Sequence, residues 1–256
     1  MSQQIRGIIF DVDGTLADTE QVGHLPAFND AFAGAQIPLV WDWETYRALY
    51  RFPAGIDRIR QGLLDWSGHQ PDEELVSALH QAKTVAYQKR LKNGLIPLRP
   101  GVARLINEAR DHGVHLAIAT TSRAKSARML VTAQLGEGAV EWFDAILGFE
   151  EGLPLKPEPD LYLRALDMMG IPAGRTIAVE DSTAGVKSAR AAAIPTLVTV
   201  NSLTLNHDFT GAFAVLDHLG ESGQPASIWD TTGPTSQTAV VTLSWLNRYV
   251  TQHTPT

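Results

Sequence analysis

The sequence contains no cysteine among its 256 residues. Disulfide bonds, thiolate metal sites and cysteine nucleophiles are therefore excluded, and the composition is compatible with a reducing compartment. Long apolar runs are also missing, since no stretch approaches the roughly 20 apolar residues of a membrane-spanning helix. The opening residues MSQQIRG do not resemble a cleavable signal. We therefore expect a cytoplasmic protein that does not enter a membrane.

Positive charge is scarce as well. Lysine and arginine number 21 against 28 aspartate and glutamate residues, which gives a net charge of −7. A surface of this sign repels nucleic acids and anionic membranes, so we expect neither as a partner, although a local basic pocket remains open. Apolar residues make up 44% of the chain, which is enough for a sizeable core. We expect a monomer, with an oligomer as the alternative.

Several apolar runs have the length of buried strands, and segments of helical periodicity lie between them. Strands that are apolar throughout and alternate with helices are typical of parallel sheets covered on both faces. The pattern predicts an α/β fold with a Rossmann-like, doubly wound parallel sheet. The predicted strands cover residues 5–11, 114–121, 143–149, 176–180 and 195–200, and the clearest helices cover residues 102–112, 161–169 and 184–193.

Residues 17–96 differ from the rest because they carry helical patterns and no convincing strand. We expect an inserted all-helical domain there, and an α/β core formed by residues 1–16 and 97–256 with a C-terminal extension. Within that extension, residues 220–237 have the composition of a linker, and residues 241–250 have the pattern of a short helix.

The stretch IIFDVDGTLADTE ends a predicted strand with two aspartates one residue apart, Asp11 and Asp13. Open parallel sheets bind ligands at the carboxyl ends of their strands. Two carboxylates this close repel each other unless a cation compensates, and Mg²⁺ prefers such oxygen ligands. A calcium-binding EF-hand loop does not fit, because it would need Gly at Leu16 and Glu at Val22. An ordinary solvated acidic turn remains the alternative.

Polar side chains also follow the later strands, at Thr120, Ser122, Lys156 and the pair 180–181. Taken alone, each has an ordinary explanation. The hydroxyl of Thr120 can end a strand or cap a helix, Ser122 can cap a helix that starts near residue 124, and Lys156 can be a surface lysine. Glu180, Asp181 and Ser182 together can cap the following helix. Because the carboxyl ends of parallel strands meet at one sheet edge, their combination with Asp11 predicts a single site.

The motifs DVDGT, IATTS, LKPEP and IAVEDS occur in this order and resemble the four motifs of the haloacid dehalogenase-like phosphohydrolases. The resemblance covers nearly the whole chain. It implies that Asp11 is a nucleophile which forms an aspartyl-phosphate, and that Asp13 is the general acid and base. It also implies phosphoryl contacts from Thr120 and a cationic clamp from Lys156. Such charge stabilisation is what phosphoryl transfer requires.

The same resemblance implies a Mg²⁺ cofactor. Its implied ligands are Asp11, Asp13 through its main-chain carbonyl, Glu180 and Asp181. Thr121 and Ser122, which follow Thr120 in the second motif, are implied contacts of the substrate.

The helical insert follows the first motif directly, as does the helical cap of a subclass that includes sugar-phosphate phosphatases and β-phosphoglucomutase. A cap closes over the site, excludes water and supplies substrate contacts. The stretch DTEQVGHLPAF resembles a pattern of this subclass, with one extra residue before the histidine. We therefore expect Thr19, Glu20 and His24 to contact the substrate, and Lys83 to match a cap lysine. A helix-surface role for His24 and a solvated one for Lys83 are the alternatives.

The segments WDWETYRALY and ATTSRAKSARMLV most resemble CbbY-like phosphatases, which act on xylulose 1,5-bisphosphate. Those proteins carry a Gly-Gly-Lys-x-Arg segment. This sequence matches it at Gly55 and Arg58 but has Ala54 and Ile56 at the other two positions. We expect Arg58 to bind a distal phosphate or a sugar hydroxyl, because a guanidinium fork suits phosphate oxygens. The missing lysine leaves open whether a bisphosphate is accepted.

Three functions are compatible with these features. The first is a Mg²⁺-dependent phosphatase that hydrolyses a small phosphorylated sugar. The second is a β-phosphoglucomutase-like mutase, which returns the phosphoryl group to the sugar rather than to water. The third is a non-catalytic phosphosugar-binding regulator, which the intact acidic and basic motif residues disfavour.

Overall fold

The computed structural model describes residues 4–52, 54–230 and 232–253. The chain divides into two compact units, one of Met1–Asp18 and Pro97–Thr256 and the other of Thr19–Ile96. We call them the α/β unit and the helical unit. Within the described residues, no helix is both long enough and apolar enough to cross a membrane.

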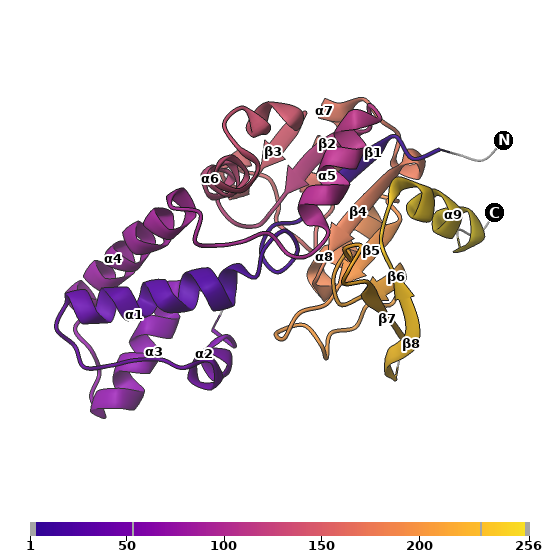
Figure 1. Cartoon of the computed structure of the whole chain (residues 1–256). Coiled ribbons are helices and arrows are strands. Elements are labelled where there is room, and N and C mark those ends of the chain that lie inside the picture. The colour runs from indigo at the N-terminus through magenta and orange to yellow at the C-terminus, as the bar shows by residue number, and fades with distance from the viewer. Residues whose placement is uncertain (1–3, 53, 231, 254–256) are drawn as a thin grey trace. The chain divides into compact units, whose positions relative to one another are not determined.

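The α/β unit is built on one sheet, which has eight strands in the described part of the chain in the order β3-β2-β1-β4-β5-β6-β7-β8 (Figure 1). Neighbours from β3 to β6 are parallel, and β7 and β8 extend one edge as antiparallel strands. The predicted parallel α/β sheet is confirmed. Its strands are β1 (Gly7–Phe10), β2 (His115–Ala119), β3 (Ala145–Leu147), β4 (Thr176–Glu180), β5 (Thr196–Thr199), β6 (Ala212–Leu216), β7 (Ala226–Asp230) and β8 (Gly233–Ala239).

Both faces of the central strands are buried. Ile9 is in register with Ala117 of β2 and Ala178 of β4, and all three pack in one cluster with Tyr162 and Ala189 from the following helices. Successive residues of a strand point to opposite faces of the sheet. Because both faces are buried here, polar side chains are accommodated at the ends of the central strands. The helices of this unit are α5 (Val102–Asp111), α6 (Ala124–Leu135), α7 (Asp160–Met169), α8 (Thr183–Ala191) and α9 (Leu243–His253), with 3₁₀ turns η2 (Ala139–Trp142), η3 (Phe149–Glu151) and η4 (Ala173–Arg175).

The prediction of a linker at residues 220–237 is wrong, because β7 and most of β8 lie there. The unpredicted strand β6 pairs in parallel with β5 and in antiparallel with β7. Ser227 N also donates to Asp217 Oδ1 at 2.9 Å. Strands rich in Ser, Thr, Gly and Gln give little hydrophobic signal, and here pairing along the sheet edge defines them.

The helical unit has its own aromatic core. Trp41 and Tyr46 are buried together with Phe28, whose ring centroid lies 5.0 Å from that of Trp41. Asp42 and Asp72 cap the second and fourth helices by accepting from backbone N–H groups. The elements are the π-helical turn η1 (Glu20–His24), α1 (Leu25–Gly34), α2 (Trp43–Leu49), α3 (Gly55–Ser67) and α4 (Glu73–Lys92).

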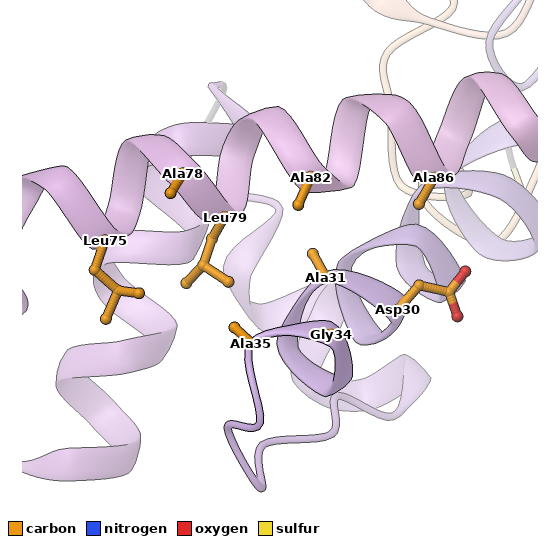
Figure 2. Close-up of a pocket in the computed structure, with 9 residues that line it drawn as sticks. All are labelled: Asp30, Ala31, Gly34, Ala35, Leu75, Ala78, Leu79, Ala82 and Ala86. Carbon is orange, nitrogen blue, oxygen red and sulfur yellow. The ribbon is translucent and has the colours of Figure 1, made fainter.

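Small residues line the contact between α1 and α4. Figure 2 shows Ala31 of α1 below Ala82 of α4, with Leu75 at one end of the contact and Asp30 at the other. The side chains leave a cavity of about 330 Å³ along this contact. Alanine lets two helices approach closely, at the expense of side-chain volume between them.

Candidate active site

Three carboxylates from two distant parts of the chain meet at the carboxyl edge of the sheet. Asp11 follows β1, Glu180 ends β4, and Asp181 comes next. Among the described residues, these three buried side chains each offer an oxygen within 4.8 Å of the others. Lys156 Nζ lies 2.7 Å from Asp11 Oδ1 and 2.6 Å from Glu180 Oε1. The cluster therefore pairs three acidic groups with one buried lysine.

Glu180 is held from several sides. Its Oε1 accepts from Lys156 and from the Tyr162 hydroxyl at 2.7 Å. Its Oε2 accepts from Asp181 N at 3.2 Å and from Ser182 Oγ at 3.4 Å. These bonds fix the Glu180 carboxylate, which in turn keeps Lys156 against Asp11. Tyr162 was not predicted as part of the site, because in the sequence it is one apolar-face residue of α7.

Gly185 of α8 leaves the space that Glu180 occupies. A Cβ at Gly185 would lie 1.9 Å from the Glu180 carboxylate carbon, which no real structure accommodates without a shift. Alanine normally stabilises a helix relative to glycine by about 1 kcal/mol. We expect Gly185→Ala to destabilise the protein by about 1–3 kcal/mol instead, as overpacking does.

Thermal and urea unfolding test this expectation. Gly34→Ala is the matched control, because Gly34 lies in α1 and a Cβ there meets nothing within 4 Å. That control should be neutral or stabilising by up to about 1 kcal/mol. A Gly185→Ala protein as stable as Gly34→Ala would show that Glu180 is not confined as described.

Asp181 is positioned by a residue that was not predicted. Asn201, which follows β5 by two positions, donates through Nδ2 to Asp181 Oδ2 at 2.7 Å. Gly14 lies against the same pair with a φ of +85°, and a Cβ there would come within 2.3 Å of Asp181 Oδ2. Glycine is needed at position 14 both for its backbone conformation and for space.

Asp13 is not one of the three clustered carboxylates, and a hydrogen-bond partner of its side chain comes from the second motif. Ser122 Oγ donates to Asp13 Oδ2 at 2.5 Å, and Thr120 Oγ1 accepts from Ser122 N at 3.1 Å. Thr120 is buried and Thr121 is exposed. The second motif therefore faces Asp13 through its serine hydroxyl.

The alternative role of Ser122 as a helix cap is wrong. The residue at the N-cap of α6 is Arg123, which makes no side-chain cap bond. Ala124 N donates instead to Glu150 Oε2 at 3.0 Å. The Ser122 hydroxyl is directed to the carboxylate of Asp13 rather than to the helix.

In the helical unit, Glu20, Tyr46 and Arg58 form one polar cluster. Arg58 Nη1 donates to the Tyr46 hydroxyl at 2.8 Å and lies 3.3 Å from Glu20 Oε2. The Tyr46 hydroxyl donates to Glu20, and Arg58 Nε donates to Phe52 O at 2.8 Å. Thr19, the residue before Glu20, is buried. Burial, with the charge of Glu20 adding to it, raises the pKa of Tyr46 well above its ordinary value, so its hydroxyl stays protonated.

His24 and Lys83 form a second polar pair in this unit. Lys83 Nζ lies 2.9 Å from His24 Nδ1, and the His24 ring stacks on Tyr87 with centroids 3.9 Å apart. Burial, reinforced by the charges of Lys83 and Arg58, lowers the pKa of His24 well below its ordinary value. A neutral His24 can accept from the ammonium. The alternative of a solvated lysine is wrong because Lys83 is buried, whereas His24 is half-buried and stacks on Tyr87.

The buried charges change the acidity of the α/β cluster. Burial raises the pKa of Asp11, Lys156 opposes this, and Glu180 and Asp13 add to it, with a resulting pKa of about 7. Burial, followed by the charges of Asp11 and Glu180, also raises the pKa of Asp181. For Lys156, burial acts to lower the pKa, but Asp11 and Glu180 outweigh it and raise the pKa. One lysine therefore leaves the negative charge of the cluster incompletely compensated.

A divalent cation fits this donor set. The ligands are carboxylate oxygens, which hard cations prefer, and they converge in a buried position with excess negative charge. Asp11 and Asp181 are the best placed to bind it, since both oxygens of Glu180 already accept hydrogen bonds. A cation there would lower the pKa values that burial and mutual repulsion raise.

Metal affinity should therefore depend on pH. Because the pKa of Asp11 is about 7 in the folded protein and 3.8 for an ordinary aspartate, the metal-free protein takes up a proton between these values on folding. The contribution of Asp11 to the free energy of unfolding therefore decreases as the pH rises from about 4 through 7. A metal ion must displace the proton, so we expect the dissociation constant to be about tenfold higher at pH 6 than at pH 8.

Calorimetric titration of the metal-free protein with Mg²⁺ or Mn²⁺ at both pH values measures this ratio. Proton release, obtained from titrations in buffers of different ionisation enthalpy, should be larger at pH 6. An affinity that does not change between pH 6 and pH 8 would contradict the raised pKa of Asp11.

Comparison with known proteins agrees with this site. Residues 5–193 match the sequence profile described as haloacid dehalogenase-like hydrolase. Protein CbbY of Cupriavidus necator is 42% identical over 228 residues, which are 86% of this chain and 88% of that protein. Protein CbbY of Cereibacter sphaeroides is 38% identical, over 90% of this chain and 99% of that protein.

Among solved structures, a CbbY variant from Rhodobacter sphaeroides in complex with xylulose-(1,5)bisphosphate has a TM-score of 0.70 at 38% identity, and the match covers 86% of this chain and 96% of that one. A putative β-phosphoglucomutase from Thermotoga maritima, at 22% identity and a TM-score of 0.66, shares the fold. The profile match extends from β1 through α8 and includes all four motifs. The chain belongs to the haloacid dehalogenase-like hydrolase family.

Proposed function

We propose that this protein is a Mg²⁺-dependent phosphatase that hydrolyses a small phosphorylated sugar through an aspartyl-phosphate on Asp11. The observation that supports this proposal is the buried cluster of three carboxylates, in which Asp11 Oδ1 lies 2.7 Å from Lys156 Nζ. A carboxylate placed beside a fixed cation, in a cluster suited to a divalent metal, can attack an anionic phosphate that it would otherwise repel.

In this mechanism an oxygen of Asp11 bonds to phosphorus, and the bond from phosphorus to the sugar oxygen breaks. Asp13, held by Ser122, gives its proton to the leaving oxygen. Water then attacks the phosphorus of the aspartyl-phosphate, Asp13 takes up its proton, and phosphate leaves with Asp11 regenerated. Lys156 and Thr120 stabilise the phosphoryl oxygens throughout. Bound Mg²⁺ would supply charge neutralisation, with Asp11, Asp181 and the Asp13 carbonyl as proposed holders and with Glu180 beside them, fixed by its own hydrogen bonds.

The sugar class follows from the relatives. CbbY from Rhodobacter sphaeroides, at 38% identity, has been crystallised with xylulose-(1,5)bisphosphate and with phosphate. A five-carbon sugar bisphosphate is therefore the first candidate substrate, although Ala54 and Ile56 stand where CbbY-like proteins have Gly and Lys. We further propose that the enzyme works in the cytoplasm as a monomer.

Phosphate release from phosphorylated C3 to C6 sugars, with xylulose 1,5-bisphosphate and ribulose 1,5-bisphosphate included, tests the proposal. We expect metal-dependent release from at least one ketose phosphate without any bisphosphate activator. Conversion of a sugar 1-phosphate to its 6-phosphate without phosphate release would identify a mutase. Binding without turnover of any substrate, in the presence of Mg²⁺, would identify a regulator.

We assign substrate recognition to the helical unit through Arg58, Glu20 and Thr19 and through the pair of His24 and Lys83. Arg58→Ala should raise KM for the preferred sugar phosphate by about tenfold or more, as loss of a charged hydrogen bond does. It should raise KM for p-nitrophenyl phosphate much less, because that substrate lacks sugar hydroxyls and a second phosphate.

The matched control is Arg60→Ala on the same helix. Arg60 pairs at the surface with Glu73 at 2.7 Å, so its loss should leave both KM values unchanged. Equal increases in KM for the two substrates in Arg58→Ala would remove Arg58 from substrate recognition.

A further inference from the structure

Arg99 is a buried arginine that contacts the loop carrying Gly14, and none of the four motifs contains it. Its side chain is 7% exposed. Nη1 donates to Gly14 O and, at 3.0 Å, to Thr199 O, while Nη2 donates to Val200 O at 2.6 Å. Nη2 also donates to Asp217 O at 2.6 Å. One guanidinium therefore ties the loop after β1 to the end of β5 and to the residue after β6.

The two loops that Arg99 ties together both reach Asp181. Gly14 belongs to the first loop and is packed against Asp181 so tightly that no Cβ fits. Asn201 belongs to the second loop and donates to Asp181 Oδ2 at 2.7 Å and to Gly14 O at 3.4 Å. The Gly14 carbonyl thus accepts from both Arg99 and Asn201. A shift of either loop would move the Asp181 carboxylate or remove its hydrogen bond.

The backbone of Arg99 adds a third connection. Arg99 N donates to Leu16 O at 2.8 Å, and Nε lies 3.3 Å from Asp18 Oδ1. Leu16 and Asp18 follow the proposed nucleophile within the same segment of chain. Arginine is suited to this place because its planar fork presents five donors in fixed directions, which lysine cannot do.

We propose that Arg99 and Asn201 are positioning residues for the metal site, which hold the Gly14 loop and the Asp181 carboxylate in the geometry that binds the divalent cation. The inference rests on the proposed function, since it assigns the cation to Asp11 and Asp181. In this proposal neither residue acts on the substrate or the reacting atoms. Their contribution is to metal affinity, because partners that orient metal ligands typically change affinity by about 10- to 100-fold.

The experiment compares Arg99→Met, Arg99→Lys and Asn201→Leu with the wild type. Calorimetric titration of the metal-free proteins with Mn²⁺ at pH 8 gives the dissociation constant without any substrate. We expect an increase of about tenfold or more in Arg99→Met and Asn201→Leu. Arg99→Lys, which keeps the charge but loses the fork, should show a smaller increase. With substrate, the metal concentration for half-maximal rate should rise in parallel, with KM for the sugar phosphate unchanged at saturating metal.

Arg104 provides the matched control. Like Arg99, it donates to main-chain carbonyls of the α/β unit, namely Gly220 O at 2.9 Å and Val241 O at 2.8 Å. Arg104→Met should lower the melting temperature while its Mn²⁺ dissociation constant remains within twofold of wild type. This control separates a general loss of stability from a loss of metal-site geometry.

The inference is overturned if Asn201→Leu and Arg99→Lys both bind Mn²⁺ within twofold of wild type, or if Arg104→Met weakens binding as much as they do. If Arg99→Met fails to fold, those two milder variants still decide the question. A different result would refute the proposed phosphatase function: the wild type would bind Mn²⁺ at this site but release no phosphate from any sugar phosphate.

Discussion

Asp11→Asn is expected to abolish phosphatase turnover, with a loss of about 10,000-fold or more, while the protein remains folded. Asparagine has the shape of aspartate but no nucleophilic carboxylate, so the aspartyl-phosphate cannot form. Its amide oxygen can still accept from Lys156, which lies 2.7 Å from Asp11 Oδ1 in the wild type. The substitution also removes one of three mutually repelling buried charges, so the metal-free protein should melt at the wild-type temperature or above.

Steady-state turnover on the best sugar phosphate and a thermal melt check both parts of this expectation. Asp167→Asn serves as the control, because Asp167 is an exposed partner of Arg164 on α7 and should change neither quantity. If Asp11→Asn retains even a tenth of the wild-type activity, the covalent mechanism is wrong.

Lys156→Met is expected to lower kcat/KM by about 1,000-fold, since it removes a fixed cation from a buried site where charge develops. It should also destabilise the fold by about 3–5 kcal/mol, because Asp11 and Glu180 would lose their buried partner. The destabilisation should be smaller at pH 6 than at pH 8, because protonation of Asp11 removes part of the uncompensated charge.

Kinetics and urea unfolding at the two pH values measure these effects. Lys156→Arg should not restore activity, since Nζ makes two contacts of 2.7 Å or less in a slot that leaves the side chain 3% exposed. Lys187→Met, an exposed lysine of α8, is the control. A Lys156→Met protein with near wild-type kcat/KM would show that this lysine only compensates charge in the resting state.

The sequence carried enough information to predict the sheet and the convergence of its acidic strand ends. Asp11 follows β1 and Glu180 ends the neighbouring strand β4, and the apolar runs before them have the length of buried strands. Because parallel strands place their carboxyl ends on one edge, the topology alone brings these residues together. The role of Lys156 as a cationic clamp was implied only by the family motif, because its position in a loop before α7 has no periodic signal.

Other features depend on contacts that no local pattern records. Arg99 and Asn201 are 102 positions apart in the sequence, and each lies in a stretch that reads as an ordinary loop. Both reach the Gly14 carbonyl only because β5 lies two strands from β1 in the folded sheet. Tyr46 was likewise predictable as an aromatic helix residue, but not as a partner of Glu20 and Arg58. The strands β7 and β8 were missed because the polar composition of residues 220–237 resembles a loop, and the apolar run AFAVL of β6 was not recognised as a strand.

The most direct test is a crystal structure of the wild-type protein grown with Mg²⁺ and beryllium fluoride, which mimics an aspartyl-phosphate. We expect one metal ion at about 2.0–2.1 Å from oxygens of Asp11 and Asp181, with beryllium bonded to the other oxygen of Asp11. A metal ion bound elsewhere, or beryllium fluoride attached to any other side chain, would contradict the account.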